Sequence, residues 1–186
     1  MRSLRLWFCA WVILALVGIE VSPAAADYYT PGSPVKVATG STAAGYTHTE
    51  GPLYDNAGGV LYCELNSTHT NDRIYRYNMS TGANDLLDSN SGGTQGMFFN
   101  PSGQIVAADR DHRHVAIRSS ADITQETVLV SSYNGKTFNG PNDLAIDSAG
   151  GIYFTDPDYE NRASLPDAAY YLAPNGTLSQ IITIFR

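Results

Sequence analysis

The sequence has 186 residues, of which 43% are hydrophobic, and its formal net charge is −7. This length suffices for one domain of ordinary size. The negative charge argues against nucleic acid and against an anionic membrane surface as partners, because both attract clustered lysine and arginine side chains.

Residues 1–26 show the pattern of a secretory signal peptide. Arg2 and Arg5 give a basic start, an apolar run of 14 residues extends from Leu6 to Ile19, and Ala24–Ala26 form a small-residue cleavage site. The run is shorter than the roughly 20 apolar residues that a membrane-spanning helix needs. We therefore expect a mature protein that begins near Asp27, is secreted or periplasmic, and has no attachment to a membrane.

The part predicted to fold spans residues 35–186 and follows a linker at residues 27–34. Val35–Ala38 are predicted to form a short strand, and Gly40–Thr49 a loop. Removal of the signal peptide leaves Cys63 as the only cysteine, so we expect no internal disulfide. Its position on a predicted strand favours a small buried hydrophobic side chain over a nucleophile.

One hairpin pattern occurs three times along the chain. In each copy, an apolar strand is followed by a turn that opens with Asp or Asn and has Gly three residues later, and the next strand ends at an acidic residue. The turn openers, 45 and 47 residues apart, are Asp55, Asn100 and Asp147. The glycines are Gly58, Gly103 and Gly150, and the acidic residues are Glu64, Asp109 and Asp156. Two strands around a glycine-containing turn predict a β-hairpin.

Each hairpin is followed by two further β-rich runs. They are residues 74–77 with 86–87, residues 115–117 with 127–130, and residues 169–172 with 178–184. Four strands in about 45 residues are typical of one blade of a β-propeller. No unit has an apolar stripe of helical period, which disfavours helical repeat proteins. The prediction is an all-β fold, a β-propeller, of which this chain holds about three four-stranded blades.

A side chain with an oxygen atom stands five residues before each turn opener, namely Glu50, Gln95 and Asn142. The innermost strand of a blade runs along the central channel, so the residues before it lie at the channel mouth. Equivalent positions of successive blades point toward one axis, and carboxylate and amide oxygens suit a hard cation such as Ca²⁺. The alternative is that each residue merely caps its own turn.

Residues 109–114, Asp-Arg-Asp-His-Arg-His, carry the densest charge of the chain. His112 and His114 stand two residues apart, a spacing that offers two metal ligands from the edge of a strand. The alternative, which we favour from the sequence, is a solvated connection between two strands.

With these residues placed, the chain resembles the gluconolactonase family, which includes regucalcin (senescence marker protein) and luciferin-regenerating enzyme. The resemblance extends from Val35 to the C-terminus. It rests on Glu50-Gly51-Pro52, the run Arg73–Tyr77, Pro141-Asn142-Asp143, and the run Gly151–Pro157 with its Phe-Thr-Asp-Pro motif. The last two motifs together are typical of the bacterial gluconolactonase branch.

The resemblance implies a six-bladed β-propeller with one divalent cation, most often Ca²⁺, at the channel mouth. It implies that Glu50 and Asn142 are metal ligands and that Asn142 also lies beside the substrate. The implied activity is Ca²⁺-dependent hydrolysis of sugar lactones, with a metal-polarised carbonyl and an activated water.

The other expected site residues surround this cation. Asp156 of the Phe-Thr-Asp-Pro motif is the candidate general base, and its alternative role is to position substrate or cap a turn. Tyr159 and Glu160, in the loop after that motif, are expected to border the substrate. Gln95 shares the register of Glu50 and Asn142 but has no clear role in the family, so we expect it to line the channel or to lie on the substrate side.

The chain departs from the family pattern in two respects. Gly140 stands where regucalcin-type members carry a substrate-binding arginine. Three units also make only half of a six-bladed ring, so we expect an incomplete copy of a longer protein whose further blades supply the remaining metal ligands. For the same reason we expect weak Ca²⁺ binding, or none, from this chain alone.

Two other functions remain open from the sequence. A propeller can present its loops to a protein partner without catalysis, or the chain can be an inactive fragment; such a protein does not need Glu50 and Asn142 on one axis. A strictosidine-synthase-like enzyme has the same fold but usually lacks the paired Pro-Asn-Asp and Phe-Thr-Asp-Pro motifs.

Overall fold

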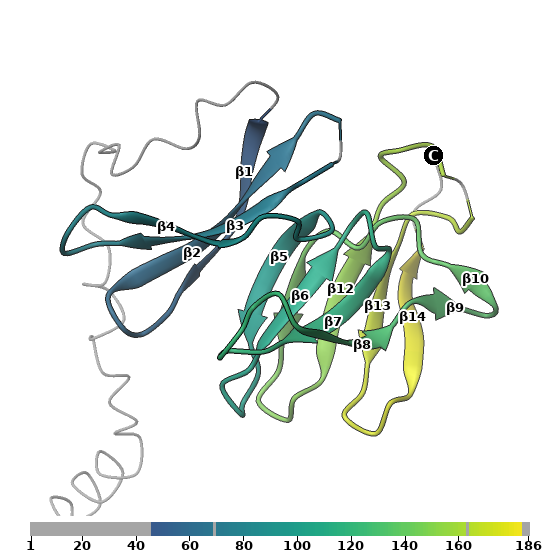
Figure 1. Ribbon diagram of the computed structural model, residues 1–186. Helices are drawn as coiled ribbons and strands as arrows, with labels where there is room; N and C mark the ends of the chain where they lie inside the picture. The colour runs from purple at the N-terminus through teal and green to yellow at the C-terminus, as the bar shows by residue number, and fades with distance from the viewer. Residues whose placement is uncertain (1–45, 69, 163, 184–186) are drawn as a thin grey trace, which may run out of the picture. The chain divides into compact units, whose positions relative to one another are not determined.

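The computed structural model describes residues 46–183 except His69 and Ala163, and the strands in this range pair antiparallel (Figure 1). The predicted signal peptide, the linker and the expected strand at Val35–Ala38 lie outside the described residues. In the part of the chain that the structure describes, no helix has the length and apolar character needed to cross a membrane.

Three four-stranded sheets follow one another along the chain, each in simple up-and-down order. The first contains β1 (Tyr46–Tyr54), β2 (Gly59–Asn66), β3 (Arg73–Asn78) and β4 (Asn84–Asp88). The second contains β5 (Thr94–Phe99), β6 (Ile105–Asp109), β7 (His114–Arg118) and β8 (Glu126–Val130). The third contains β11 (Leu144–Ile146), β12 (Ile152–Asp156), β13 (Ala168–Leu172) and β14 (Leu178–Thr183). The predicted four-stranded units are therefore confirmed.

A small hairpin that the sequence analysis missed separates the second and third sheets. It consists of β9 (Ser132–Tyr133) and β10 (Lys136–Thr137). Asn134 and Gly135 connect the two strands, with φ angles of 50° and 77°. Two consecutive positive φ angles belong to a type I′ turn, for which Asn-Gly is the preferred pair.

The turn of the repeated hairpin has the same hydrogen bonds in all three sheets. One side-chain oxygen of the turn opener accepts the N–H groups two and four residues later; for Asp147 these belong to Ala149 and Gly151, at 2.9 and 2.8 Å. Asp55 and Asn100 make the equivalent pairs. The glycine of each turn has a positive φ, which a residue with a Cβ adopts only at a cost. The repeat in the sequence is thus the repeat of one turn geometry.

Strand β6 of the second sheet is buried on both faces. Ile105 and Ala107 pack into a core with the first sheet, and Val106 and Ala108 pack into a core with the third sheet. Successive side chains of a strand point to opposite faces, so one strand serves both cores. Cys63 belongs to the first of these cores, is fully buried, as predicted, and has a free thiol. Burial raises the pKa of its thiol well above the ordinary value, consistent with an inert side chain.

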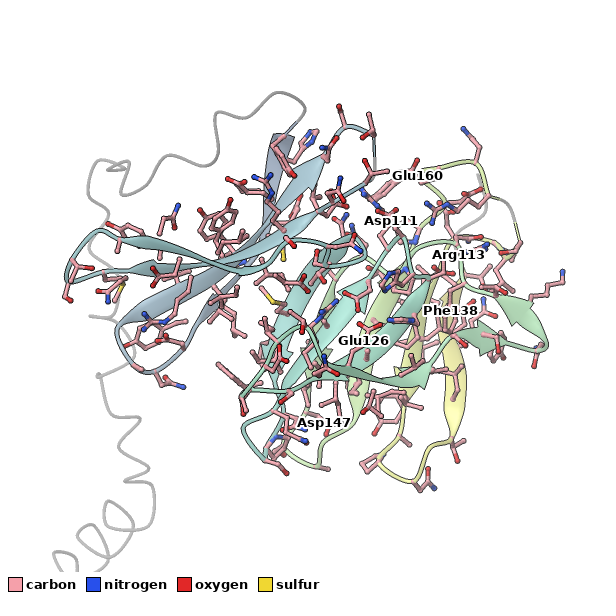
Figure 2. The ribbon with its side chains drawn as sticks, in the orientation of Figure 1. Asp111, Arg113, Glu126, Phe138, Asp147 and Glu160 are labelled. Atoms are coloured by element: carbon pink, nitrogen blue, oxygen red, sulfur yellow. The ribbon has the colours of Figure 1, made fainter. Side chains whose placement is uncertain are left out.

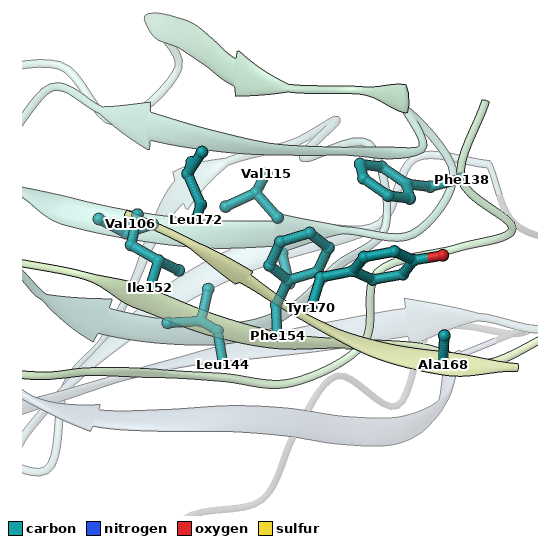
Figure 3. Packing of buried hydrophobic residues seen from close by; sticks show 10 residues of the cluster. Val106, Val115, Phe138, Leu144, Ile152, Phe154, Ala168, Tyr170 and Leu172 are labelled. Atoms are coloured by element: carbon teal, nitrogen blue, oxygen red, sulfur yellow. The ribbon is translucent and has the colours of Figure 1, made fainter. Parts of the chain in front are cut away.

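Three aromatic rings dominate the core between the second and third sheets (Figure 3). Phe138 lies 5.2 Å from Phe154 and 5.1 Å from Tyr170, and Phe154 lies 5.4 Å from Tyr170, measured between ring centroids. Phe138 is fully buried although it belongs to no strand. It therefore anchors the segment that leads from the small hairpin to Asn142.

One expectation about local structure is wrong, and another is right only in part. Residues 46–49 were expected in a loop, but β1 begins at Tyr46, because these residues pair with the end of β2. Residues 109–114 contain the predicted connection between two strands, here β6 and β7, and His112 in it is exposed, but Asp109, Arg110 and His114 are at least 92% buried. Ion pairs with residues from other parts of the chain compensate the charge of this run.

Candidate active site

Two of the residues expected at the channel mouth lie where the first strand of their sheet is irregular, and the third, Asn142, lies just before β11. The pairing of β1 with β2 shifts register between Glu50 and Leu53, and the pairing of β5 with β6 shifts between Thr94 and Met97. Glu50 and Gln95 thus occupy the same kind of bulge, each directly before a glycine. Bulges turn side chains away from the regular alternation of a strand and are common next to active sites.

Gln95 and Asn142 are in direct contact. The Nδ2 amide of Asn142 donates a hydrogen bond of 3.0 Å to Oε1 of Gln95, and the N–H of Gly96 donates one of 2.8 Å to the carbonyl of Asn142. Gln95 is 96% buried, so this contact fixes its amide. The Nδ2 group of Asn142 is used in this hydrogen bond, and its Oδ1 oxygen can accept another hydrogen bond or bind a cation.

The residue after Glu50, Gly51, packs against the backbone of Gln95. A Cβ atom at Gly51 would lie 1.9 Å from the carbonyl oxygen of Gln95, so the backbones of β1 and β5 meet here and only glycine fits. The φ of Gly51 is +56°, a second reason for glycine. The side chain of Glu50 is exposed. The structure therefore joins Gln95 to Asn142 directly and places Glu50 one residue from the backbone of Gln95.

Asp156 is fully buried and holds the segment that precedes Asn142. Its Oδ2 accepts the N–H of Asn139 at 2.9 Å, and its Oδ1 accepts the N–H of Gly140 at 2.7 Å. Burial raises the pKa of the Asp156 carboxyl, although the two N–H groups lower it in part. These contacts give Asp156 a positioning role, and its predicted role as a general base stays a prediction.

The loop after β12 is hydrogen-bonded to the turn between β6 and β7. Arg162 donates to the carbonyls of Arg110 and Asn139, at 2.9 and 3.1 Å, and pairs with Asp111 at 3.1 Å. Asp111 and Glu160 lie at one end of the sheets, opposite the turn-opening residue Asp147 (Figure 2). The sequence analysis missed Arg162, because its partners are 23 to 52 positions away and no motif marks it.

The predicted substrate-bordering residues lie on this loop. Tyr159 is 64% exposed, and the Oε1 atom of Glu160 lies 4.0 Å from Nη1 of Arg110. Their contact with a substrate stays a prediction.

Arg110 fills the space beside Gly140. A Cβ atom at position 140 would lie 2.9 Å from Cγ of Arg110, so a side chain at this position would displace the arginine. Arg110 also pairs with Asp72 at 3.5 Å and with Asp111 at 3.0 Å. Burial raises the pKa of Asp72; burial acts in the same direction on Asp111, but the hydrogen bonds and charge of Arg110 outweigh it and lower the pKa of Asp111.

Comparison with known proteins agrees with this architecture. Residues 48–185 match the family model of the SMP-30/Gluconolactonase/LRE-like region. A gluconolactonase from Zymomonas mobilis subsp. mobilis is 46% identical over 98 residues, which cover 48% of this chain and 27% of that protein.

Solved structures of low sequence identity share the fold. An X-ray structure assigned as a gluconolactonase superposes with a TM-score of 0.68 at 24% identity, over 87% of this chain and 56% of the other. A gluconolactonase from Xanthomonas campestris gives 0.63 at 24% identity, over 76% and 48% of the two chains. Luciferin-regenerating enzyme gives 0.56 at 10% identity, over 73% and 45%.

These likenesses confirm the predicted β-propeller fold. The chain spans between about a quarter and just over half of the length of the relatives it matches.

Proposed function

Since the chain belongs to the SMP-30/gluconolactonase/LRE-like family, we propose that it forms the part of a lactone hydrolase that holds the cation and the substrate. The observation that carries this proposal is the contact between Gln95 and Asn142, with Gly51, the residue after Glu50, against the backbone of Gln95. Two of the three residues that share a register in the sequence thus meet in space, although they belong to different sheets.

The residues at this point fit a hard divalent cation, and we propose Ca²⁺. Glu50 offers an exposed carboxylate and Asn142 offers Oδ1, and Ca²⁺ is bound in proteins by such oxygen atoms. A bound cation of this kind supplies Lewis-acid polarisation of a carbonyl oxygen. Two protein ligands do not complete a Ca²⁺ site, so we propose that further blades of the full-length protein supply the others.

The remaining residues of this chain prepare the site. Asp156 holds the backbone at Asn139 and Gly140, and so keeps Asn142 in its place two residues later. Arg162 fastens the loop that carries Tyr159 and Glu160, which we propose as substrate contacts. Each carboxylate oxygen of Asp156 keeps a second lone pair after it accepts its backbone N–H, so the proposed proton transfer from water does not require either hydrogen bond to break.

The substrate that we propose is a sugar lactone, in line with the gluconolactonases that the chain resembles. Hydrolysis of glucono-1,5-lactone by the full-length form is the test, followed by titration of the released acid at constant pH. We expect activity that a chelator abolishes and added Ca²⁺ restores. Hydrolysis at an unchanged rate in excess chelator would contradict the metal-dependent mechanism, and absence of hydrolysis with Ca²⁺ would contradict the function.

We also propose export of the protein from the cytoplasm, on the pattern of residues 1–26. Sequencing the N-terminus of the mature protein tests this proposal. A start near Asp27 supports export, and a protein that retains residues 1–26 would contradict it.

A further inference from the structure

Two histidines and two carboxylates, none of them assigned to the lactone site, meet in the second sheet. They are Asp109 on β6, His112 in the turn between β6 and β7, His114 on β7 and Glu126 on β8, and one ligand atom from each lies within 4.8 Å of all the others. Figure 2 labels Glu126 in the region of these strands. We infer that this cluster is a binding site for a transition-metal dication of the Zn²⁺ class.

The distances within the cluster fit tetrahedral coordination. Ligand atoms that lie about 2.0–2.2 Å from a tetrahedral ion are separated from each other by about 3.3–3.6 Å. Nε2 of His114 lies 3.3 Å from Oδ2 of Asp109 and 3.3 Å from Oε1 of Glu126. Nδ1 of His112 lies 3.4 Å from the same oxygen of Glu126. Three of the six edges of a tetrahedron therefore have the right length before any ion is bound.

The ring nitrogen Nε2 of His114 lies between two carboxylates without a hydrogen bond to either of them. Its side chain is nine-tenths buried, and its Nε2 makes no hydrogen bond with any described residue. A buried polar nitrogen without a hydrogen bond is costly, and a metal ion bound to it would remove that cost. The nearby oxygens lie at ligand-to-ligand distance but out of line for a hydrogen bond.

The charge of the surroundings matches a dication. Arg118, which is 1% exposed, pairs with Asp88, Asp109 and Glu126, each at 3.2 Å. Three carboxylates thus face one guanidinium group, which leaves a surplus of two negative charges when both histidines are neutral. Burial lowers the pKa of His114, but Asp109 and Glu126 outweigh it and raise the pKa, as expected from this surplus. An ion with two positive charges balances this surplus. Two imidazoles and two carboxylates favour Zn²⁺ and related ions over Ca²⁺, which prefers oxygen alone.

Groups around the cluster hold its ligands in place, as expected for a metal site. The hydroxyl of Thr94 donates to Oδ1 of Asp109, and Arg118 donates to Oδ2. The ring of His112 lies against Gly92, where a Cβ atom would come within 2.3 Å of Nδ1. The side chain of His112 is 43% exposed, so an ion can reach the cluster from solvent on that side.

Titration of the chain with Co²⁺ and Zn²⁺ in excess Ca²⁺ tests the proposal, because Ca²⁺ fills sites made only of oxygen. We expect one equivalent of Co²⁺ to give the intense visible absorption of a tetrahedral site, and Zn²⁺ to displace it. His112→Ala, at an exposed position, should weaken Zn²⁺ binding at least about tenfold, and His114→Gln should abolish the absorption. His48→Ala, which removes an exposed histidine outside the cluster, should change neither.

Absence of tetrahedral absorption in the wild-type chain would overturn the proposal, and the cluster would then be an ion-pair network only. Zn²⁺ binding that His112→Ala and His114→Gln leave unchanged would overturn it as well. Neither result depends on lactone hydrolysis, so the proposed function and this metal site fail or stand separately.

Discussion

Replacement of Asp156 by asparagine tests whether the carboxylate of Asp156 positions the backbone or acts as a general base. Asp156 uses both of its oxygens, one for the N–H of Asn139 and one for the N–H of Gly140. Asparagine has one oxygen, so its amide group would face one of these N–H groups and leave a buried donor without an acceptor. Such a donor costs about 1–3 kcal/mol, and we expect Asp156→Asn to lower the free energy of unfolding by about that amount.

A matched control exists within the same hairpin. Asp147 accepts two backbone N–H groups on a single oxygen, and Asn100 does the same in the preceding sheet. Asparagine can therefore replace Asp147 without losing a turn hydrogen bond, and the free energy of unfolding should change by less than about 0.5 kcal/mol. Urea unfolding of the wild type and of both variants, followed by circular dichroism, measures the difference.

Equal stability of Asp156→Asn and the wild type would refute this account of Asp156. If stability were kept but lactone hydrolysis were lost in the full-length form, the carboxylate would instead act as the general base.

Three further substitutions test the turns, the contact between sheets and the core. Asp55→Asn keeps the hydrogen bonds of its turn but loses the ion pair with Arg76. Burial raises the pKa of Asp55 in the folded protein, but hydrogen bonds and this ion pair outweigh it, so the pKa lies below its ordinary value. The stabilisation by Asp55 is therefore fully present above its pKa in the unfolded chain and is lost as pH falls through its lowered pKa in the folded protein. The difference in free energy of unfolding between Asp55→Asn and the wild type should thus shrink in acid. Gly51→Ala should lower the midpoint temperature of thermal unfolding far more than Gly58→Ala does. Both glycines have a positive φ, but only a Cβ atom at position 51 would collide with the backbone of Gln95. Phe138→Ala should cost about 3–5 kcal/mol in urea unfolding, and a cost below about 1 kcal/mol would contradict its role as an anchor.

Much of the fold could be predicted because each turn is a local event. The Asp or Asn opener and the glycine three residues later fix one backbone geometry, and the same hydrogen bonds occur in all three copies. The hairpin at Asn134-Gly135 could have been found by the same reasoning, since this pair is the strongest short hairpin signal. It was missed because its strands are only two residues long.

The charged residues could not be placed from local sequence alone. Arg118 is buried, because partners up to 30 positions away neutralise it. The same is true of Asp109 and Arg110, which the local charge places in a solvated loop until their partners Arg118 and Asp72 are known. The register of Glu50, Gln95 and Asn142 indicated one shared site, and the structure joins two of these residues directly.

The central claim is that Glu50 binds the cation on which lactone hydrolysis depends. Ca²⁺ titration of glucono-1,5-lactone hydrolysis by the full-length form tests it most directly, with Glu50→Gln compared with the wild type and with Asp85→Asn, which removes an exposed carboxylate on β4. We predict that Glu50→Gln abolishes activity at all Ca²⁺ concentrations that saturate the wild type, whereas Asp85→Asn follows the wild-type curve. Near-normal activity and Ca²⁺ dependence of Glu50→Gln would contradict the claim.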